Sequence, residues 1–188
     1  MIKLSVLIAT IDSRKYKFDA LVKYLNEIKT DDVEILSICD NKEMNIGYKR
    51  NLLLQQSKGA YVCFIDDDDM IPYDYFTKVF EGIEQNVDCI GFLVRLTGWA
   101  SYPIICSLSN QWNGWFSDFG GYKYVRCPNH LSPMKREHAL AIGYPNNKRT
   151  GEDADFSLRL KASGLIKTEH YIPKIMYDYR FKNEPNKY

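Results

Sequence analysis

Four consecutive aspartates, Asp66 to Asp69, follow the apolar stretch 61–65 and stand three residues before Pro72. In a solvated loop, four adjacent negative charges repel one another. A divalent cation would cancel that repulsion, because Mg²⁺ and Mn²⁺ prefer hard oxygen ligands such as carboxylates. The run therefore predicts a metal site, with a solvated acidic turn that caps the next helix as the alternative.

The first half of the chain alternates short apolar runs with amphipathic segments. Predicted strands cover residues 3–10, 33–41 and 60–66, and predicted helices cover residues 13–30, 47–59 and 72–86. Such alternation with short connections predicts an α/β fold with a parallel sheet covered by helices. Ligands bind these sheets beyond the carboxyl ends of the strands. Residues 10–14, residues 40–41 and the aspartate run each follow one strand, so we expect them to converge on one crevice.

The second half has a less regular pattern. We expect a strand over residues 89–100, helices over 132–143 and 150–164, and a final strand with a polar end over 169–188. Thr150 is a plausible N-cap of the second of these helices. Residues 109–130 are rich in glycine, asparagine and aromatic residues, which are costly to leave in water. We therefore expect this segment to form strands and loops over the crevice.

Composition limits the classes of protein to which the chain can belong. Its 188 residues are 45% hydrophobic and 26% charged, which is typical of a globular domain. The net charge of +1 gives no general indication of nucleic acid or anionic membrane as a partner. No stretch approaches the ~20 apolar residues of a membrane-spanning helix. Five scattered cysteines without a CxxC pair argue against zinc and favour a reducing compartment, so we expect a soluble, cytoplasmic protein.

Four segments, each a weak signal alone, occur in the order seen in one enzyme family. They are SVLIATIDSR, CDN, GYKRNLLLQQSKGAYVCFIDDDDMIP and GEDADFSLRL. With them the chain resembles, from its start to about Leu160, the family 2-like glycosyltransferases of the GT-A fold. The most specific part combines KRN, the spaced glycine, and FIDDDD with a following proline.

The resemblance implies a Rossmann-like GT-A fold with a mainly parallel central sheet. It divides a single domain, residues 1–188, into a nucleotide-binding half (1–95) and an acceptor-side half (96–188). It also implies transfer of a sugar from a UDP-linked donor to a hydroxyl group, with inversion and with Mn²⁺ or Mg²⁺. Compact soluble relatives of this kind resemble those of phages and viruses. In that case the location would be the host cytoplasm and the acceptor could be a modified DNA base.

By this resemblance, a set of polar residues should bind the donor. These residues are Thr10, Arg14, Asp40, Lys49, Arg50, Asn51, Asp66 and Asp67. Asp40 would hydrogen-bond the uracil edge, although Asn41 replaces the usual second acidic residue and leaves the base open. Asp66 would face the ribose or the metal, and Asp67 takes the variable place of the motif. A solvated position is the alternative for Arg14 and for one of Lys49 and Arg50.

The resemblance also implies metal-binding and catalytic roles. Asp66 and Asp68 would ligate the metal, and Asp178 stands where many GT-A enzymes complete the shell with histidine. Asp153 matches the base that accepts the proton of the acceptor hydroxyl, and Glu152 would orient it. Acidic residues in a first helical turn also complement the helix dipole, which would explain this pair without catalysis.

The acceptor side is less defined. Trp112 and Trp115 could form a platform on which a sugar or base stacks, and His130 could face the crevice. Packing of the irregular segment is an equal alternative for the tryptophans. A lone histidine is more often structural than functional.

Two other functions are compatible with the pattern. A nucleotidyltransferase also places carboxylates at strand ends, but it usually carries a glycine-rich basic loop after the first strand, and residues 10–17 contain no glycine. A non-catalytic module that binds nucleotides or sugars is the second alternative. Such a module would have lost its catalytic residues, and the presence of Asp66, Asp68 and Asp153 argues against this alternative.

Overall fold

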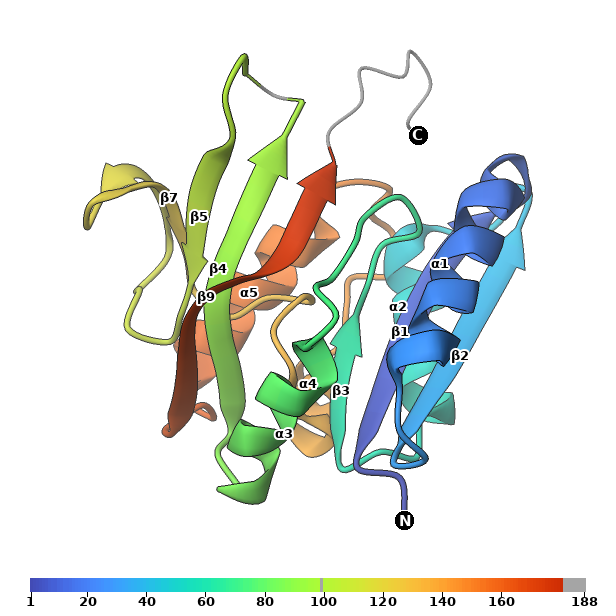
Figure 1. Ribbon diagram of the computed structural model, residues 1–188, viewed down its shortest axis with the longest axis horizontal. Coiled ribbons are helices and arrows are strands. Elements are labelled where there is room, and N and C mark those ends of the chain that lie inside the picture. The colour runs from blue at the N-terminus through green and yellow to red at the C-terminus, as the bar shows by residue number, and fades with distance from the viewer. Residues whose placement is uncertain (99, 181–188) are drawn as a thin grey trace.

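The computed structural model describes residues 1–98 and 100–180 (Figure 1). Within these residues, nine strands form a mixed sheet with helices on both faces. None of the described helices has the length and apolar character needed to cross a membrane. Trp99, expected within a strand, and the polar end expected after the last strand lie outside the described residues.

The first half follows the predicted alternation of strands and helices. Its elements are β1 (Leu4–Ile11), α1 (Lys15–Ile28), β2 (Val33–Asp40), α2 (Ile46–Gln56), β3 (Tyr61–Phe64) and α3 (Tyr75–Glu84). A short 3-10 turn, Asp12–Arg14, joins β1 to α1. Strand β1 pairs in parallel with β2 on one side and with β3 on the other. The carboxyl ends of these three strands therefore lie along the same edge of the sheet.

The second half turns the sheet into a mixed one. Its elements are β4 (Cys89–Thr97), β5 (Ile104–Leu108), β6 (Trp115–Phe119), β7 (Tyr122–Arg126), β8 (Met134–Lys135), α4 (Arg136–Ile142), α5 (Glu152–Ser163) and β9 (Glu169–Arg180). The strand order is β2-β1-β3-β8-β4-β5-β7-β6, and β9 pairs with β4. The short strand β8 lies antiparallel to both β3 and β4. The expectation of a mainly parallel sheet is thus only partly confirmed, because β1 with β2 and β3, β4 with β9, and β5 with β7 pair in parallel, whereas the other pairs are antiparallel.

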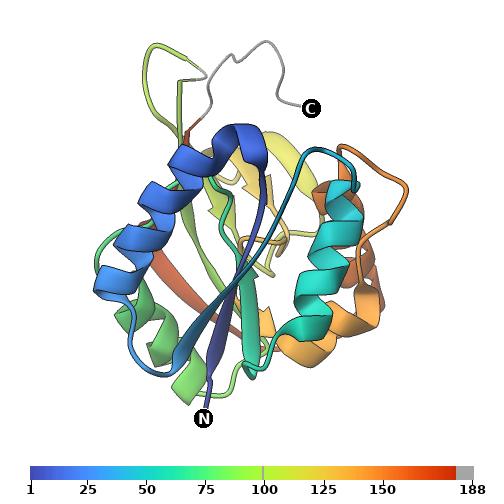
Figure 2. The same cartoon turned by 90° about the vertical axis from the view of Figure 1, so that its right-hand side faces the viewer.

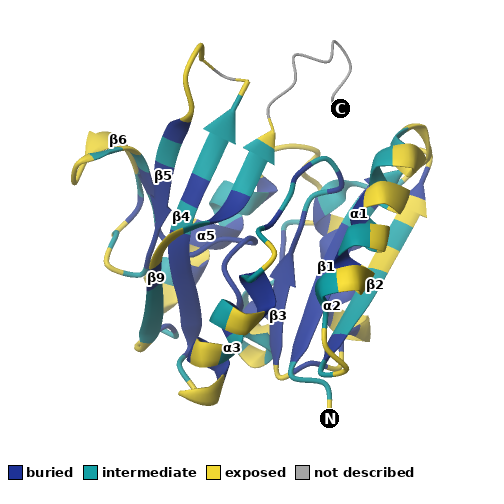
Figure 3. Cartoon of the chain, in the orientation of Figure 1, coloured by how far each residue is buried: buried dark blue, intermediate teal, exposed yellow. Residues whose placement is uncertain are grey.

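Each face of the sheet has its own hydrophobic core. Successive side chains of a strand point to opposite faces, so Leu4, Val6 and Ile8 pack beneath α1 and α3. Leu7 points the other way and joins the core beneath α2, α4 and α5. The turned view in Figure 2 shows these two helix layers with the strands between them, and Figure 3 shows the buried centre of the sheet. Burying one such aliphatic side chain contributes about 1.5–3 kcal/mol.

The carboxylate of Asp88 connects β8 to the segment that leads into β9. It accepts hydrogen bonds from Lys135 (3.0 Å) and from the backbone N–H groups of Lys167 and Thr168 (both 3.0 Å), and it lies 3.2 Å from His138. Burial alone would raise the pKa of Asp88. The hydrogen bonds from Lys135 and the two N–H groups outweigh burial and lower the pKa well below its usual value.

We expect Asp88→Asn to lower the free energy of unfolding by about 1.5–3 kcal/mol at pH 7, because several donors lose a charged acceptor. A lowered folded-state pKa means that this stabilisation is complete above the unfolded pKa of about 3.9 and is lost as the pH falls further. Urea denaturation between pH 7 and pH 3 should therefore show a flatter acid slope for the variant. As a control, Asp19→Asn removes an exposed partner of Lys15 and should cost less than about 0.5 kcal/mol. Equal acid slopes in parent and Asp88→Asn would contradict this role.

Candidate active site

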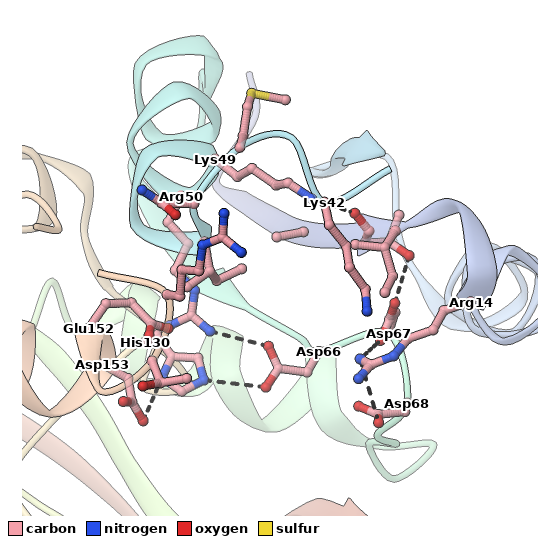
Figure 4. Close-up of a pocket in the computed structure, with 18 of the residues that line it drawn as sticks. Arg14, Lys42, Lys49, Arg50, Asp66, Asp67, Asp68, His130, Glu152 and Asp153 are labelled. Carbon is pink, nitrogen blue, oxygen red and sulfur yellow. Dashed lines mark hydrogen bonds and ion pairs between the residues drawn. The ribbon is translucent and has the colours of Figure 1, made fainter. Parts of the chain in front are cut away.

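A cleft of about 230 Å³ opens at the carboxyl ends of β1 and β3 (Figure 4). Its lining includes the end of β1, the turn after β2, the first turns of α2, the aspartate run and the segment that begins α5. The predicted convergence on one crevice is confirmed for the residues after β1 and β3, whereas after β2 the cleft is lined by Lys42 and Met44 and not by the expected residues 40–41. Individual side chains, however, differ in whether they face the cleft or bind other parts of the chain.

Asp67 is a structural tether between β1 and β3. Its two carboxylate oxygens accept hydrogen bonds from the Thr10 hydroxyl group (2.6 Å) and from Arg14 (2.8 Å). Burial raises the pKa of Asp67, and the bonds from Thr10 and Arg14 oppose that effect. Asp67 borders the cleft while both of its carboxylate oxygens are bound within the chain, and its contact with the sugar donor stays a prediction. The Thr10 hydroxyl group donates its hydrogen to Asp67, so this hydrogen is not offered to the nucleotide sugar.

We expect Asp67→Ala to lower the free energy of unfolding by about 1–3 kcal/mol, because it leaves the Thr10 hydroxyl and Arg14 without this buried acceptor. Chemical denaturation at pH 7 measures the change. Asp74→Ala is the control, since Asp74 precedes α3 without a side-chain capping bond. We expect the control to stay within about 0.5 kcal/mol of the parent. An Asp67→Ala protein as stable as this control would refute the tether.

Asp66 and Asp68 border the cleft on either side of Asp67 in the run. Asp68 lies 3.7 Å from Arg14 and borders the cleft, with a side chain only 7% exposed. The Asp66 side chain is 31% exposed and lies 3.4 Å from Arg50. Among the described residues, no group of three or more His, Cys, Asp or Glu side chains is arranged to hold a metal ion. Two carboxylates fit a cation that takes its other ligands from phosphate and water, as Mg²⁺ commonly does.

The prediction that Asp178 is a metal ligand is wrong. Its carboxylate forms a two-pronged ion pair with Arg95 on the neighbouring strand β4, and it does not line the cleft. The reason is the alternation of β9, which turns Tyr177 and Tyr179 toward the aspartate run and Asp178 away. Tyr177 donates a hydrogen bond to Asp69 (2.9 Å), and Tyr179 lines the cleft.

Asp69 is buried behind the cleft. Besides the Tyr177 hydroxyl group, its carboxylate accepts the backbone N–H of Arg180 at 2.8 Å. Burial raises the pKa of Asp69 well above its usual value, and the charge of Asp66 adds to that effect. Asp69 therefore supports the run by binding the end of β9.

Asp40 shapes a turn and does not line the cleft. It forms an ion pair with Lys49 and accepts backbone N–H bonds from Met44 (2.7 Å) and Lys42 (3.3 Å). Burial would raise the pKa of Asp40, but the bonds from Lys49 and Met44 outweigh it and lower the pKa. Asp40 is thus not placed to contact a uracil edge in the cleft, contrary to the prediction. Lys49 borders the cleft, but its ammonium group is bound to Asp40 and to the Thr10 carbonyl oxygen.

Helix α2 contributes Arg50 and Asn51, which have different roles. Arg50 is buried in the cleft wall, 3.4 Å from Asp66 and 3.4 Å from Glu152, with its guanidinium 5.2 Å from the centre of the Phe64 ring. Burial would lower the pKa of Arg50, but the charges of Asp66 and Glu152 outweigh burial and raise it. Asn51 does not line the cleft. It bonds the backbone of Tyr144 through both its amide nitrogen and its oxygen (2.8 Å each) and so fixes α2 against the segment that leads into α5.

The first turn of α5 brings two carboxylates to the cleft. Glu152 is buried against Arg50, whereas the Asp153 side chain is 30% exposed and faces the cleft. The N-cap of α5 is Gly151, which has a left-handed conformation (φ 72°), and no side chain caps the helix. The prediction that Thr150 is the N-cap is therefore wrong. His130 lies between the two acidic segments, with its ring 3.6 Å from Asp66 and 4.0 Å from Asp153 (Figure 4).

Comparison with known proteins decides the family. The model of glycosyl transferase family 2 matches residues 12–142, which include β2, α2 and the aspartate run. The chain belongs to glycosyl transferase family 2. The match ends before Glu152, so the acidic pair of α5 is not part of it. No curated protein matches the chain.

Solved structures agree with the family in fold. S. aureus TarS 1-349 in complex with UDP-GlcNAc superposes with a TM-score of 0.71 at 14% identity, over 97% of this chain and 60% of that one. The complex of the same protein with UDP gives a TM-score of 0.67 at 16% identity, over 96% and 61% of the two chains. This chain thus spans about 60% of the TarS 1-349 chain. The predicted GT-A fold is confirmed, and the family is that of glycosyltransferases and not the nucleotidyltransferase alternative.

Trp112 and Trp115, which were predicted to form an aromatic platform for the acceptor, pack within the protein. Neither Trp112 nor Trp115 lines the cleft. The indole N–H of Trp112 bonds Ser107 (3.0 Å), and that of Trp115 bonds Ser157 of α5 (2.9 Å). These contacts agree with the alternative, in which the two tryptophans hold the irregular segment in place. His130 is the residue of the predicted acceptor set that does line the cleft.

Two cations of the family 2 cleft were missed by sequence reasoning. Lys42 follows Asp40 in a left-handed conformation (φ 64°), and its side chain points into the cleft. Arg149 borders the cleft from the segment before α5. Within residues 1–98 and 100–180, neither side chain has an ion-pair partner, in contrast to Arg14, Lys49 and Arg50. A cation two residues beyond a strand-ending aspartate was the available signal for Lys42.

Proposed function

We propose that this chain transfers a sugar from a UDP-linked donor to a hydroxyl group of an acceptor, with inversion and with Mn²⁺ or Mg²⁺. The observation that carries the proposal is a single cleft in which Asp66 and Asp68 lie on one wall and Asp153 on another. Membership of glycosyl transferase family 2 supports the reaction class. The structures of TarS in complex with UDP and UDP-GlcNAc support a UDP-linked donor.

The donor diphosphate belongs beside Asp66 and Asp68, which would hold the cation. When bound there, the cation neutralises charge that develops on the diphosphate as it leaves. Lys42 and Arg149 have no ion-pair partner within the described residues, and each lines the cleft and can bind a phosphate oxygen by charge. Because Arg14 and Lys49 are bound to internal carboxylates, they contribute mainly by shaping the wall.

Asp153 is the base in this proposal. Its carboxylate takes the proton from the acceptor hydroxyl group, and the oxygen attacks the anomeric carbon from the side opposite the diphosphate. The bond between that carbon and the phosphate oxygen breaks, and UDP leaves with the electron pair. Attack from the opposite side inverts the anomeric configuration.

Glu152 has a different task from its neighbour. Its side chain is only 7% exposed and is paired with Arg50, so it is not placed to receive a proton from a substrate. Arg50 also reaches Asp66, and one buried guanidinium therefore compensates a carboxylate on each wall of the cleft. This pairing leaves Asp153 as the carboxylate of the α5 pair that is available to an acceptor.

A donor screen tests the proposal. The melting temperature is measured with UDP-, GDP- and TDP-linked sugars, each with and without Mn²⁺. We expect the largest increase with a UDP-linked sugar and Mn²⁺, accompanied by slow release of UDP as water replaces the acceptor. If no nucleotide sugar raises the melting temperature or is hydrolysed under any of these conditions, the proposed function is wrong.

A further inference from the structure

We infer that His130 is a positioning residue that holds the Asp153 carboxylate for proton removal and links it to Asp66 on the donor side of the cleft. The inference rests on the proposed function, because it assigns a partner to the proposed base. It concerns the acceptor half of the reaction, and it gives His130 a role through Asp153 in place of direct binding of the acceptor.

The backbone fixes the position of His130 at the end of β3. Its carbonyl oxygen accepts the N–H of Phe64 at 2.8 Å, which continues the pairing of β3 with β8. The side chain of the preceding Asn129 accepts the N–H of Leu131 at 2.9 Å and closes the turn around the histidine. The ring is therefore carried by a buried turn that is hydrogen-bonded to β3.

Each ring nitrogen faces a different carboxylate. Nε2 lies 3.6 Å from Oδ2 of Asp66, and Nδ1 lies 4.0 Å from Oδ2 of Asp153. The side chain is only 7% exposed, and neither nitrogen is within hydrogen-bond distance of a group in the described part of the chain. A buried polar ring without a hydrogen bond is unfavourable unless a partner arrives. The two carboxylates are the groups toward which the ring is directed.

The distances suit a site that tightens when substrate binds. Catalytic hydrogen bonds are often long in the absence of substrate and shorten in the reactive complex. His130 also borders a second cavity of about 10 Å³, whose lining includes Ser132, Met134 and Phe156. A small movement of the ring toward α5 would allow Nδ1 to donate to Asp153 and to fix which carboxylate oxygen faces the acceptor.

Asp66 connects this arrangement to the donor. One of its oxygens faces Arg50 and the other faces His130. A donor that engages Asp66 therefore changes the contacts of the same ring that reaches Asp153. In this way the base is best aligned when the donor side is occupied, which favours transfer over unproductive proton exchange.

His130→Phe tests the inference because phenylalanine keeps a ring of similar shape but has no hydrogen-bonding nitrogen. We expect kcat for hydrolysis of the UDP-sugar to fall about 10- to 100-fold, the scale of a misaligned catalytic group. The Kd for UDP in Mn²⁺, measured by calorimetry, should stay within about 3-fold of the parent. His170→Gln is the matched control, since His170 lies on β9 outside the cleft and bonds Gln85. It should hydrolyse the donor at the parental rate.

A double-mutant cycle with Asp153→Asn separates positioning from a structural role. If His130 acts through Asp153, the double variant should be no slower than Asp153→Asn alone. Losses that multiply in the double variant, or a kcat of His130→Phe equal to the parent, would overturn the inference. A UDP Kd that weakens as much as kcat falls would also overturn it and make His130 a donor ligand.

His130→Gln repeats the cycle if His130→Phe has a low melting temperature, because glutamine keeps a polar group in the same space. The same outcomes decide the inference with this variant. Failure of the proposed function has a separate sign: Asp153→Asn itself would then hydrolyse the donor at the parental rate. Loss of activity in Asp153→Asn together with full activity in both His130 variants would overturn the inference alone.

Discussion

Asp153→Asn is expected to slow hydrolysis of the UDP-sugar donor at least ~100-fold, the usual scale of general-base catalysis. Its carboxylate faces the cleft, whereas the other member of the pair, Glu152, is bound to Arg50. Asparagine has nearly the same shape but cannot take a proton from an attacking hydroxyl group or water. Because Asp153 scarcely contacts the donor in this proposal, the Kd for UDP should stay within about 3-fold of the parent. Release of UDP and calorimetric titration measure the two quantities.

Asp155→Asn provides a control on the same helix. Asp155 is paired with Arg159 (2.6 Å) and Lys148 (3.0 Å) and does not line the cleft. Those partners lower the pKa of Asp155, which identifies it as a stabilising surface carboxylate. Its variant should retain the parental rate. If Asp153→Asn instead loses only ~0.3–1 kcal/mol of stability and keeps its rate, Asp153 serves the helix dipole and is not the base.

Removal of divalent cations by EDTA is expected to weaken UDP binding at least ~10-fold. Each carboxylate that borders the cleft repels a diphosphate, and the interaction between unit charges 4 Å apart is about 1 kcal/mol even in water. The guanidinium groups closest to Asp66 and Asp68 are those of Arg50 and Arg14, which are already engaged with carboxylates of the chain. Calorimetry with Mn²⁺ and with EDTA gives the comparison directly. Equal Kd values in the two conditions would remove the cation from the proposal.

Asp68→Asn should abolish most of the difference between Mn²⁺ and EDTA. The Kd for UDP in Mn²⁺ is expected to rise, while the Kd in EDTA should stay the same or fall because one repelling charge is gone. Asp74→Asn serves as the control, since Asp74 follows the run by a few residues and does not line the cleft. Because Asp68 lies against Arg14, a modest loss of stability is expected and is measured separately. An unchanged response to Mn²⁺ in Asp68→Asn would show that this carboxylate is not a ligand.

The sequence by itself determined the general architecture and the place of the site. The alternation of short apolar runs and amphipathic segments specified β1 to α3, because a strand buried on both faces is a continuous apolar run, whereas a helix that covers a sheet repeats its apolar residues every 3.6 residues. Parallel strands end at the same edge, so polar residues after β1, β2 and β3 had to meet there. The aspartate run was recognised because it directly follows a predicted strand, whereas Glu152 and Asp153 were assigned by the resemblance to family 2-like glycosyltransferases.

Only the tertiary structure decided which carboxylate binds what. Asp67 and Asp68 are adjacent and chemically identical, yet Asp67 accepts hydrogen bonds from Thr10 and Arg14, whereas Asp68 lies 3.7 Å from Arg14. Asp178 was excluded because alternation along β9 turns it toward Arg95. A sequence states the charge of a residue but not its partner, and the partner depends on residues far along the chain.

The second half of the sheet also depended on tertiary contacts. Strand β8 has only two residues, Met134–Lys135, and its antiparallel pairing with β3 and β4 joins the two parts of the sheet. No period can be recognised in so short a segment. The facing of His130 toward both Asp66 and Asp153 has the same origin, because three chain segments meet there that are separate in sequence. Local patterns therefore determined the elements and the edge at which they act, and long-range packing determined the chemistry of each side chain.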